Sequence, residues 1–442
     1  MNRLLFIAYH FPPHGGAGVQ RSLKFVKYLP DFGIQPTVLT SNETADRKWC
    51  PSDASLTSEI PADTQVVRLP WPTDRSPGHR STADSRLEEA ANLVATQQLE
   101  AIFVSMSPFS DAHFAALLSA CCRIPWIADL RDPWALDEFQ VYRTRWHRFT
   151  AMREMKWALK SASLIIMNTP EAVASFRDAF PDFSTQRVVS ITNGYDAADF
   201  VPEAEPTNND RFTIVHAGFL HATAGLRQRQ RAGQYRLFGR TESGVELLPR
   251  SHYYLLQALE QWHTEDPSIH QHVELKLVGE PRPIDRELVA RSSVAPQITF
   301  TGYLVHAESV NVIRRADLLF LPLHDLPLGR RATIVPGKTY EYLATGRPIL
   351  AAVPSGDAQD FVSRAGTGRI CAPTDVEGML RHLKVEYRAW QERQPRPAVD
   401  NRFVETFERR ALTHQLAREL HALRGSEEVV RCLQPAAIQI SA

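Results

Sequence analysis

Short runs of apolar residues, each followed by a loop and an amphipathic stretch, recur along the chain. Such runs are typical of strands that are buried on both faces of a parallel sheet. Between them, Val19, Leu23, Val26 and Leu29 recur at spacings of three and four residues, on one face of a helix. The alternation predicts an α/β protein with doubly wound parallel sheets. The predicted strands are residues 4–10, 101–106, 126–130, 164–168, 188–192, 212–217, 273–278, 298–301, 318–321 and 349–353.

These ten strands are more than one typical sheet holds, and a chain of 442 residues is long enough for two domains. The composition changes at residues 201–210, where the sequence VPEAEPTNND is polar, acidic and rich in proline. We interpret this segment as a linker between domains. The sequence therefore predicts a Rossmann-like N-terminal domain at 1–202 and a Rossmann-like C-terminal domain at 210–400. A helix at 401–423 and a tail without a clear pattern at 424–442 follow.

Two long insertions interrupt the pattern. Residues 43–84 are polar and rich in proline, and we expect loops there with little core. Residues 222–250 are basic and follow a predicted strand, so they form either a solvated helix and loop or a part of a ligand site.

Composition narrows the class of protein. Lysine and arginine together equal aspartate and glutamate, so the formal charge is zero, and a general nucleic-acid binder is not expected. The apolar run at residues 4–9 is too short to span a membrane, and no other stretch approaches 18 apolar residues. An odd number of cysteines without a CxxC pair argues against a disulfide framework or a structural zinc site. We expect a cytoplasmic protein, soluble or peripheral at the inner face of the membrane.

A glycine-rich segment, FPPHGGAG, follows the first predicted strand at residues 11–18. Glycines at the carboxyl end of a strand let backbone N–H groups approach a ligand closely, although many such loops are only tight turns. The segment is neither the GxGxxG fingerprint of nicotinamide-binding proteins nor a P-loop.

Charged residues end the strand at 126–130, in the sequence DLRDPW. Because unpaired charges are costly to bury, they either form an arginine–carboxylate pair that fixes the loop or face a cleft. In the second case Arg131 and Asp132 are candidate catalytic residues.

The strongest local pattern is PGKTYEYLATGRPIL at residues 336–350. Pro336 and Gly337 mark the start of a helix and Gly346 its end. The free N–H groups at that start would attract a diphosphate, and Lys338 adds a positive charge. Glu341, one turn later, is either a ribose ligand or an acidic residue favoured by the helix dipole.

Taken together with ITNGYD at residues 191–196, these motifs make the chain resemble the GT-B glycosyltransferases of family 4, over roughly residues 4–423. The resemblance implies two Rossmann-like domains facing across a cleft, with the acceptor on the first domain and the nucleotide-sugar donor mainly on the second. It also implies retention of configuration at the sugar carbon and a terminal helix that crosses back to the first domain.

The resemblance also assigns roles to residues. Asp132 would face the transferred sugar, Lys338 and the turn before it would hold the diphosphate, and Glu341 would bind ribose. Asn193 and Gly194 would lie near the interdomain hinge. The remaining candidates for the donor and nucleotide site are glycines: Gly15, Gly16, Gly18, Gly218 and Gly337.

One departure from the family pattern concerns the donor sugar. The family usually has a second glutamate eight residues before Glu341, where this chain has Thr333. His324 or Asp325 would then replace it as a contact to the donor sugar. The basic residues that usually follow the first strand of the donor domain are also displaced, and Arg227 or Arg250 would substitute for them.

Residues 142–160 combine six basic residues with Trp146, Phe149 and Trp157. Such a segment suits an anionic membrane surface, but an ordinary helix with its aromatic residues in the core has the same composition. The acceptor would be a glycan or a lipid-linked molecule, in the synthesis of cell-envelope polysaccharide or glycoconjugates. No DxD motif stands out, so no cofactor and no required metal are expected. A non-catalytic nucleotide-sugar binder and a sugar-nucleotide epimerase of similar fold remain as alternatives.

Overall fold

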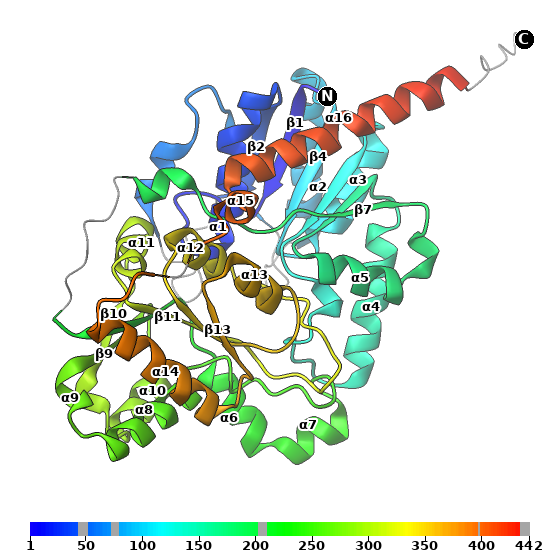
Figure 1. Ribbon diagram of the computed structural model, residues 1–442. Helices are drawn as coiled ribbons and strands as arrows, with labels where there is room; N and C mark the ends of the chain where they lie inside the picture. The colour runs from blue at the N-terminus through cyan, green and yellow to red at the C-terminus, as the bar shows by residue number, and fades with distance from the viewer. Residues whose placement is uncertain (43–51, 72–78, 202–209, 397, 434–442) are drawn as a thin grey trace, which may run out of the picture.

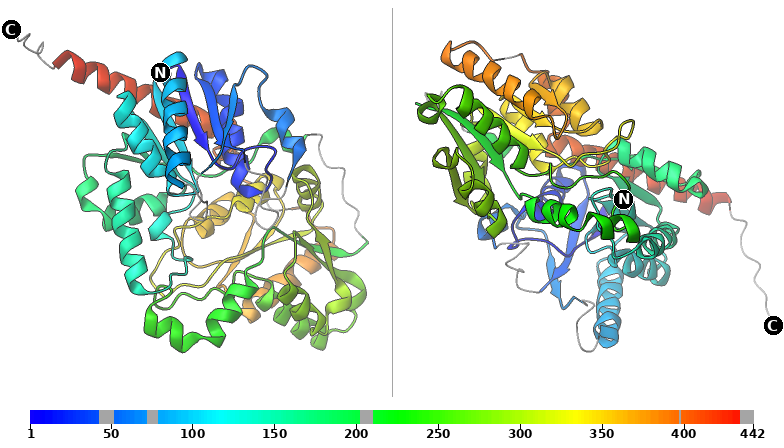
Figure 2. Two further views of the ribbon diagram at one scale, coloured as in Figure 1. Left: turned by 180° about the vertical axis from the view of Figure 1, so that it is seen from behind. Right: turned by 90° about the horizontal axis from the view of Figure 1, so that it is seen from below.

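Two parallel β-sheets, each with helices on both faces, form the computed structural model (Figure 1). The structure describes residues 1–42, 52–71, 79–201, 210–396 and 398–433. The predicted linker at 201–210 and the end of the predicted tail lie almost wholly outside these residues. The rear view in Figure 2 again places the half with the first sheet above the half with the second.

The first sheet has the strand order β3-β2-β1-β4-β5-β6-β7. Its order reverses between β1 and β4, which is the place where doubly wound sheets bind ligands. The strands are β1 (Arg3–Ala8), β2 (Gln35–Ser41), β3 (Val66–Leu69), β4 (Ala101–Met106), β5 (Trp126–Leu130), β6 (Leu164–Met167) and β7 (Arg187–Ser190). The helices are α1 (Ala17–Tyr28), α2 (His79–Thr96), α3 (Asp111–Cys122), α4 (Arg145–Leu159) and α5 (Pro170–Ala179).

The second sheet has the order β10-β9-β8-β11-β12-β13, with the reversal between β8 and β11. The strands are β8 (Phe212–Ala217), β9 (Val273–Val278), β10 (Ile298–Gly302), β11 (Leu318–Pro322), β12 (Ile349–Ala352) and β13 (Gly368–Cys371). The helices are α6 (Ala222–Gln230), α7 (Ala232–Phe238), α8 (Tyr253–Glu265), α9 (Ile269–His272), α10 (Pro283–Ala290), α11 (His306–Arg314), α12 (Gly337–Thr345), α13 (Asp357–Ala365) and α14 (Val376–Gln391).

All ten predicted strands are confirmed, with ends that differ by up to two residues, and three further strands were missed. Strand β2 was not predicted because Thr37, Thr40 and Ser41 interrupt its apolar run, although all three are buried. Strands β3 and β13 have four residues each and lie at sheet edges, where an apolar run is shortest. The described part of residues 43–84, expected to form loops with little core, contains the short strand β3, and its Leu56 and Trp71 are buried in the core.

Two helices end the described chain, α15 (Asn401–Glu405) and α16 (Arg409–Leu433). The helical structure is interrupted between them, where the backbone of Tyr195 pairs with this segment. Tyr195 accepts from the N–H of Arg409 at 2.8 Å and donates to the carbonyl of Phe407 at 3.1 Å. Leu412, Leu416 and Leu420 of α16 are buried in the core beside α1 of the first half. No helix among the described residues is long and apolar enough to cross a membrane.

Candidate active site

A cavity of about 420 Å³ lies between the two sheets and is lined by residues of both halves. Loops after β1 and β5 of the first sheet reach it, as do the loops after β8 and β9 of the second. These are carboxyl ends of strands at or next to the two reversals of strand order. Each sheet therefore presents to the cavity the edge at which α/β proteins bind ligands.

The glycine-rich loop forms one wall of the cavity. Gly16 has a φ of 84°, a left-handed value that favours glycine, and α1 begins at the next residue. Arg131 fixes this loop, because its Nη1 atom donates to the carbonyl of Gly18 and its Nε atom donates to the carbonyl of Met106 at 3.0 Å. Arg131 thus binds the backbone carbonyls of the first turn of α1 and of the end of β4, beside Asp132, which also lines the cavity.

The neighbouring carboxylate, Asp129, is bound elsewhere. Arg21 of α1 contacts it at 2.6 Å, and both side chains are almost fully buried. The same guanidinium donates to the carbonyl of Thr192 at 2.6 Å and to that of Ile191 at 2.9 Å. This buried pair joins α1, β5 and the segment after β7 beneath the cavity.

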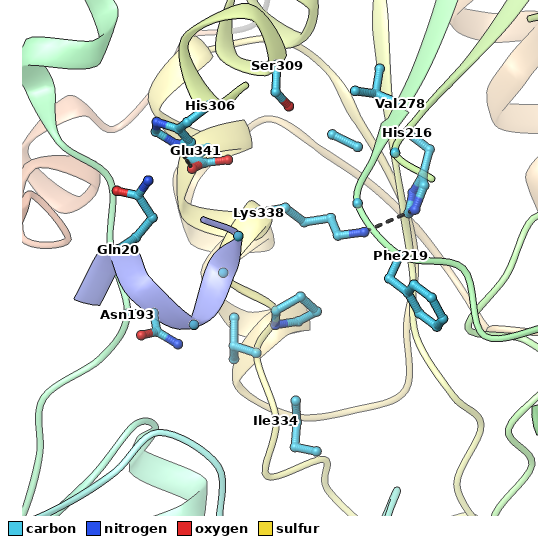
Figure 3. Close-up of a pocket in the computed structure, with 18 of the residues that line it drawn as sticks. Gln20, Asn193, His216, Phe219, Val278, His306, Ser309, Ile334, Lys338 and Glu341 are labelled. Atoms are coloured by element: carbon cyan, nitrogen blue, oxygen red, sulfur yellow. Dashed lines mark hydrogen bonds and ion pairs between the residues drawn. The ribbon is translucent and has the colours of Figure 1, made fainter. Parts of the chain in front are cut away.

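Lys338, in the first turn of α12, is part of the opposite wall of the cavity (Figure 3). Its Nζ atom lies 3.0 Å from Nε2 of His216, whose Nδ1 atom lies 3.1 Å from the carbonyl of Phe320. Because Nδ1 must carry the proton to donate to that carbonyl, Nε2 presents a lone pair to Lys338. Burial, together with the charge of Arg250, lowers the pKa of Lys338 to about 7. Gly218 leaves the space for this ammonium, since a Cβ there would lie 3.2 Å from Nζ.

Glu341 faces the cavity one turn further along α12. Its Oε1 atom lies 2.9 Å from Nε2 of His306 on α11, and Nδ1 of His306 lies 3.7 Å from Asp199. Burial disfavours the charged imidazole, but the hydrogen bond and charge of Glu341 outweigh it and raise the pKa of His306. The imidazole therefore holds the carboxylate, and Figure 3 shows the two side chains next to each other.

Arg250, at the end of the basic insertion, also lines the cavity. Its guanidinium lies 4.6 Å from the ring centroid of Phe139, and it faces the charges of Asp137, Asp132 and Glu138. Burial first, and then the charges of Glu138 and Asp132, raise the pKa of Asp137 to about 7. Of the two substitutes expected for the displaced basic residues, Arg250 lies at the cavity and Arg227 does not.

Most of the insertion is solvated. Arg231 and Arg236 are exposed on α6–α7, and Arg229 pairs with Glu246 on the surface at 3.3 Å. Arg229 and Arg236 border a second cavity, between α4 and α6–α7. Residues 222–250 are thus largely a solvated helix and loop, whereas their last residue, Arg250, lines the cavity, and its contact with a ligand stays a prediction.

The structure brings together eight of the residues proposed for catalysis and donor binding. They are Gly16, Gly18, Arg131, Asp132, Gly218, Gly337, Lys338 and Glu341. Gly15 lies outside the lining, and so do His324, Asp325 and Thr333. His324 and Thr333 point instead to the carboxylate of Glu138, and the backbone of Asp325 pairs with that of Glu246.

Sequence reasoning missed His216, His306 and Ser309, which all line the cavity. His216 lies near the end of a buried strand, where an ionisable side chain is unusual, and this was the signal that it has a special role. His306 and Ser309 lie on an ordinary amphipathic helix and carried no such signal. Among the described residues, no group of three or more His, Cys, Asp or Glu side chains is placed to hold a metal ion. A reaction without a metal stays a prediction.

Solved structures with the same fold cover almost the whole chain. Alr3699/HepE of Anabaena in complex with UDP-glucose is 15% identical, with a TM-score of 0.61 over 95% of this chain and 99% of that one. Sucrose-phosphate synthase of Thermosynechococcus elongatus is 15% identical, with a TM-score of 0.62 over 96% and 100%. A glycosyltransferase of Rickettsia africae is 12% identical, with a TM-score of 0.63 over 96% and 98%. No curated protein matches the chain significantly in sequence.

Two family models match the chain, one in each half. Residues 15–194 match the glycosyl transferase 4-like domain, and residues 246–385 match the glycosyl transferases of group 1. The first match contains the glycines of the glycine-rich loop, Arg131 and Asp132, and the second contains Lys338 and Glu341. The protein is therefore a GT-B glycosyltransferase that belongs to group 1, with a family 4-like N-terminal domain.

Proposed function

We propose that the protein transfers a sugar, with retention of configuration, from a nucleoside-diphosphate sugar to a glycan or lipid-linked acceptor. The observation that carries this proposal is the arrangement of α12, whose N-terminus, Lys338 and Glu341 all face Asp132 across one cavity. The proposed biological setting is the synthesis of cell-envelope polysaccharide or glycoconjugates.

The charges of the two walls suit the two sides of the reaction. Breaking the bond between sugar and diphosphate leaves negative charge on the diphosphate and positive character on the sugar. The N–H groups at the start of α12 and the ammonium of Lys338 would stabilise the first. Arg250 adds a second positive charge at the same cavity. The carboxylate of Asp132 would stabilise the second, and Glu341, held by His306, would accept hydrogen bonds from ribose hydroxyls.

A uridine nucleotide is the first donor to test, because the Anabaena structure of the same fold holds UDP-glucose. The experiment incubates the protein with UDP-sugars and a panel of glycan and lipid-linked acceptors, and follows the anomeric proton of the product by NMR. We expect a new glycosidic linkage with the anomeric configuration of the donor. A product of inverted configuration would contradict retention. Conversion of the donor sugar without an acceptor would favour an epimerase, and binding without turnover would favour a non-catalytic binder.

We further propose that α4 docks on an anionic membrane and so presents the enzyme to lipid-linked acceptors. Trp146, Phe149 and Trp157 are 66%, 50% and 69% exposed, so the alternative that they lie in the core is wrong. Arg143, Arg145, Arg153, Lys156 and Lys160 surround them and are also exposed. Apolar rings beside basic side chains are the combination that binds anionic lipid surfaces.

The surface continues onto the second half of the molecule. The N–H of Tyr142, just before α4, donates to the carbonyl of Arg240 after α7 at 2.6 Å. Leu237 and Phe238 of α7 are 74% and 49% exposed. Exposed apolar side chains are therefore present on helices of both halves that are joined at this backbone contact.

Co-sedimentation with vesicles tests this proposal. The wild type should bind vesicles that contain phosphatidylglycerol and leave vesicles of pure phosphatidylcholine unbound. The variant Trp146→Ala/Trp157→Ala should lose most of the binding, whereas Val385→Ser, which removes an exposed apolar residue elsewhere, should keep it. Equal binding by all three proteins would contradict a role for α4.

A further inference from the structure

One buried carboxylate of the first half contacts residues of the second half, next to the segment that lines the donor cavity. Glu138 lies between β5 and α4 and is 2% exposed. Its Oε1 atom accepts from the backbone N–H of Thr333 at 2.9 Å, and its Oε2 atom accepts from the hydroxyl of Thr333. Nε2 of His324, also in the second half, lies 3.3 Å from Oε1. Both oxygens of the carboxylate are thus bound across the interface.

Thr333 is held by the opposite half through its whole backbone unit. In addition to the two bonds from Glu138, its carbonyl accepts from the hydroxyl of Thr169 at 2.7 Å. The backbone N–H, the hydroxyl and the carbonyl of Thr333 are therefore all hydrogen-bonded to residues of the first half. The residues that follow, from Ile334 to Lys338, line the donor cavity and lead into α12. The position of residue 333 consequently decides where the N-terminus of α12 lies.

The carboxylate is expensive to bury unless it is charged and bound. Burial alone would raise the pKa of Glu138, but His324 and the hydrogen bonds from Thr333 outweigh it, so that the pKa lies below the ordinary value. The group is therefore an anion at neutral pH. Hydrogen bonds to a charged group are about twice as strong as neutral ones, and a buried anion that loses its partners is strongly destabilised. The contact accordingly favours the arrangement in which the two halves are closed on each other.

The sequence adds an independent observation. Position 333 is where the resemblance to family 4 leads one to expect a glutamate, and this chain has threonine. The structure puts the carboxylate of Glu138 directly on that threonine. An acidic group is thus present beside this position, but it comes from the other half of the molecule and binds Thr333 itself instead of lining the cavity.

We propose that Glu138 is a positioning residue for the donor, which binds position 333 from across the cleft and holds the segment 333–338 in its binding position. The inference rests on the proposed donor site. Because the carboxylate and the segment belong to different halves, the donor site is complete only when the two halves are closed. A donor that binds the segment would then favour closure as well.

A comparison of four proteins tests the proposal: the wild type, Glu138→Thr, Thr333→Glu and the double variant Glu138→Thr/Thr333→Glu. The substrate is chosen from a panel of nucleotide sugars with uridine, guanosine, adenosine and thymidine bases, as the one that stabilises the wild type most. The quantity measured is kcat/KM for this nucleotide sugar. We expect Glu138→Thr to lower kcat/KM by roughly 10- to 100-fold, the range of one hydrogen-bonded charge. Thr333→Glu in the wild-type background should also lower it, because two carboxylates then meet in one buried site. In the Glu138→Thr background the same Thr333→Glu change should instead recover about tenfold.

This reversal of sign separates a positioning role from a packing role, since a packing defect is not repaired by moving a carboxylate. Glu138→Gln keeps the shape and removes the charge, and it decides the matter if Glu138→Thr does not fold. Glu171→Gln is the matched control, because Glu171 also bridges the two halves, to Arg331 at 2.6 Å, but does not touch residue 333. We expect little change for this control.

Two results would overturn the proposal. The first is a kcat/KM of Glu138→Gln that equals that of the wild type. The second is a further loss, in place of a recovery, in the double variant. If either occurs while the nucleotide still binds the wild type and fails to bind Glu341→Ala, the proposed function stands and only the role of Glu138 is wrong. If no nucleotide of the panel binds the wild type, both proposals fail together.

Discussion

The two walls of the cavity hold their charges in different ways. On the wall of the second half, Lys338 lies against His216 and Glu341 against His306, so these two groups have partners within their own half, whereas Arg250 faces carboxylates of the first half. On the wall of the first half, Arg131 binds backbone carbonyls of α1 and β4 in the same half, and glycines and amide side chains form most of the remaining surface. The second wall is organised in advance for a charged ligand, whereas the first provides space and one carboxylate, Asp132. Donor binding and sugar transfer should therefore be separable by mutation.

The largest effect should come from the first wall. Asp132→Asn removes the carboxylate that would stabilise positive character on the sugar, and we expect transfer to fall by about 100- to 1000-fold, as for other groups that act mainly in the transition state. The affinity for the nucleoside diphosphate should change little, because the proposed phosphate ligands lie on the other wall. Steady-state transfer and thermal unfolding with the nucleotide measure the two quantities. An equal loss in both would remove the distinction between the walls.

Lys338→Met tests the second wall. It deletes the ammonium next to the start of α12, and we expect the affinity for the nucleoside diphosphate to fall roughly 10- to 100-fold. Lys384→Met is a matched control, because Lys384 pairs with Glu265 on the surface far from the cavity lining. Calorimetric titration compares the two. Similar affinities for both variants and the wild type would show that Lys338 does not contact the phosphate.

The pH dependence should sharpen the same point. Since burial and Arg250 lower the pKa of Lys338 to about 7, the free protein carries this ammonium below that pH and loses it above. At higher pH donor binding must take up a proton, so the affinity for a UDP-sugar should fall by up to about tenfold per pH unit. Titrations between about pH 6 and about pH 9 measure it, because the diphosphate of the sugar nucleotide does not ionise there. Lys338→Arg, whose charge persists, should flatten the profile. A profile that is flat in the wild type would contradict the assignment.

The smallest effect concerns the partner of Glu341. His306→Phe fills the same space but leaves the carboxylate without its imidazole, and we expect the affinity for the nucleotide to fall about two- to tenfold. Removal of the ribose hydroxyl should matter less in this variant than in the wild type, because Glu341 is no longer oriented. Titrations with UDP and 2′-deoxy-UDP measure that difference. An unchanged discrimination between the two nucleotides would show that His306 does not act through Glu341.

The same contrast between the walls explains what could be predicted from the sequence. The apolar runs predicted both sheets, because a strand that is buried on both faces has apolar residues at consecutive positions. Lys338 and Glu341 were found since one segment, 336–350, carries the helix start and both side chains. The partners of these residues come from distant strands and helices, and sequence spacing says nothing of such contacts. Only the fold brings His216 to Lys338 and His306 to Glu341.

Two further cases show the same limit. The substitution of Thr333 for the expected glutamate was visible in the sequence, but the contact of Thr333 with Glu138 was not, because Glu138 lies 195 positions earlier in the chain. Arg250 was one of two candidates, and only the path of α6 and α7 shows that the end of the insertion, not its beginning, returns to the cavity.

The most direct test of the account is thermal unfolding of the wild type and of Glu341→Ala with a panel of nucleoside diphosphates and their sugars. A ligand present at about 100 times its dissociation constant stabilises the folded state by roughly 2.7 kcal/mol. Nucleotides of one base should raise the unfolding temperature of the wild type, and Glu341→Ala should abolish most of this rise. If no nucleotide raises the unfolding temperature of the wild type, or if Glu341→Ala retains the full rise, the donor site is not at α12.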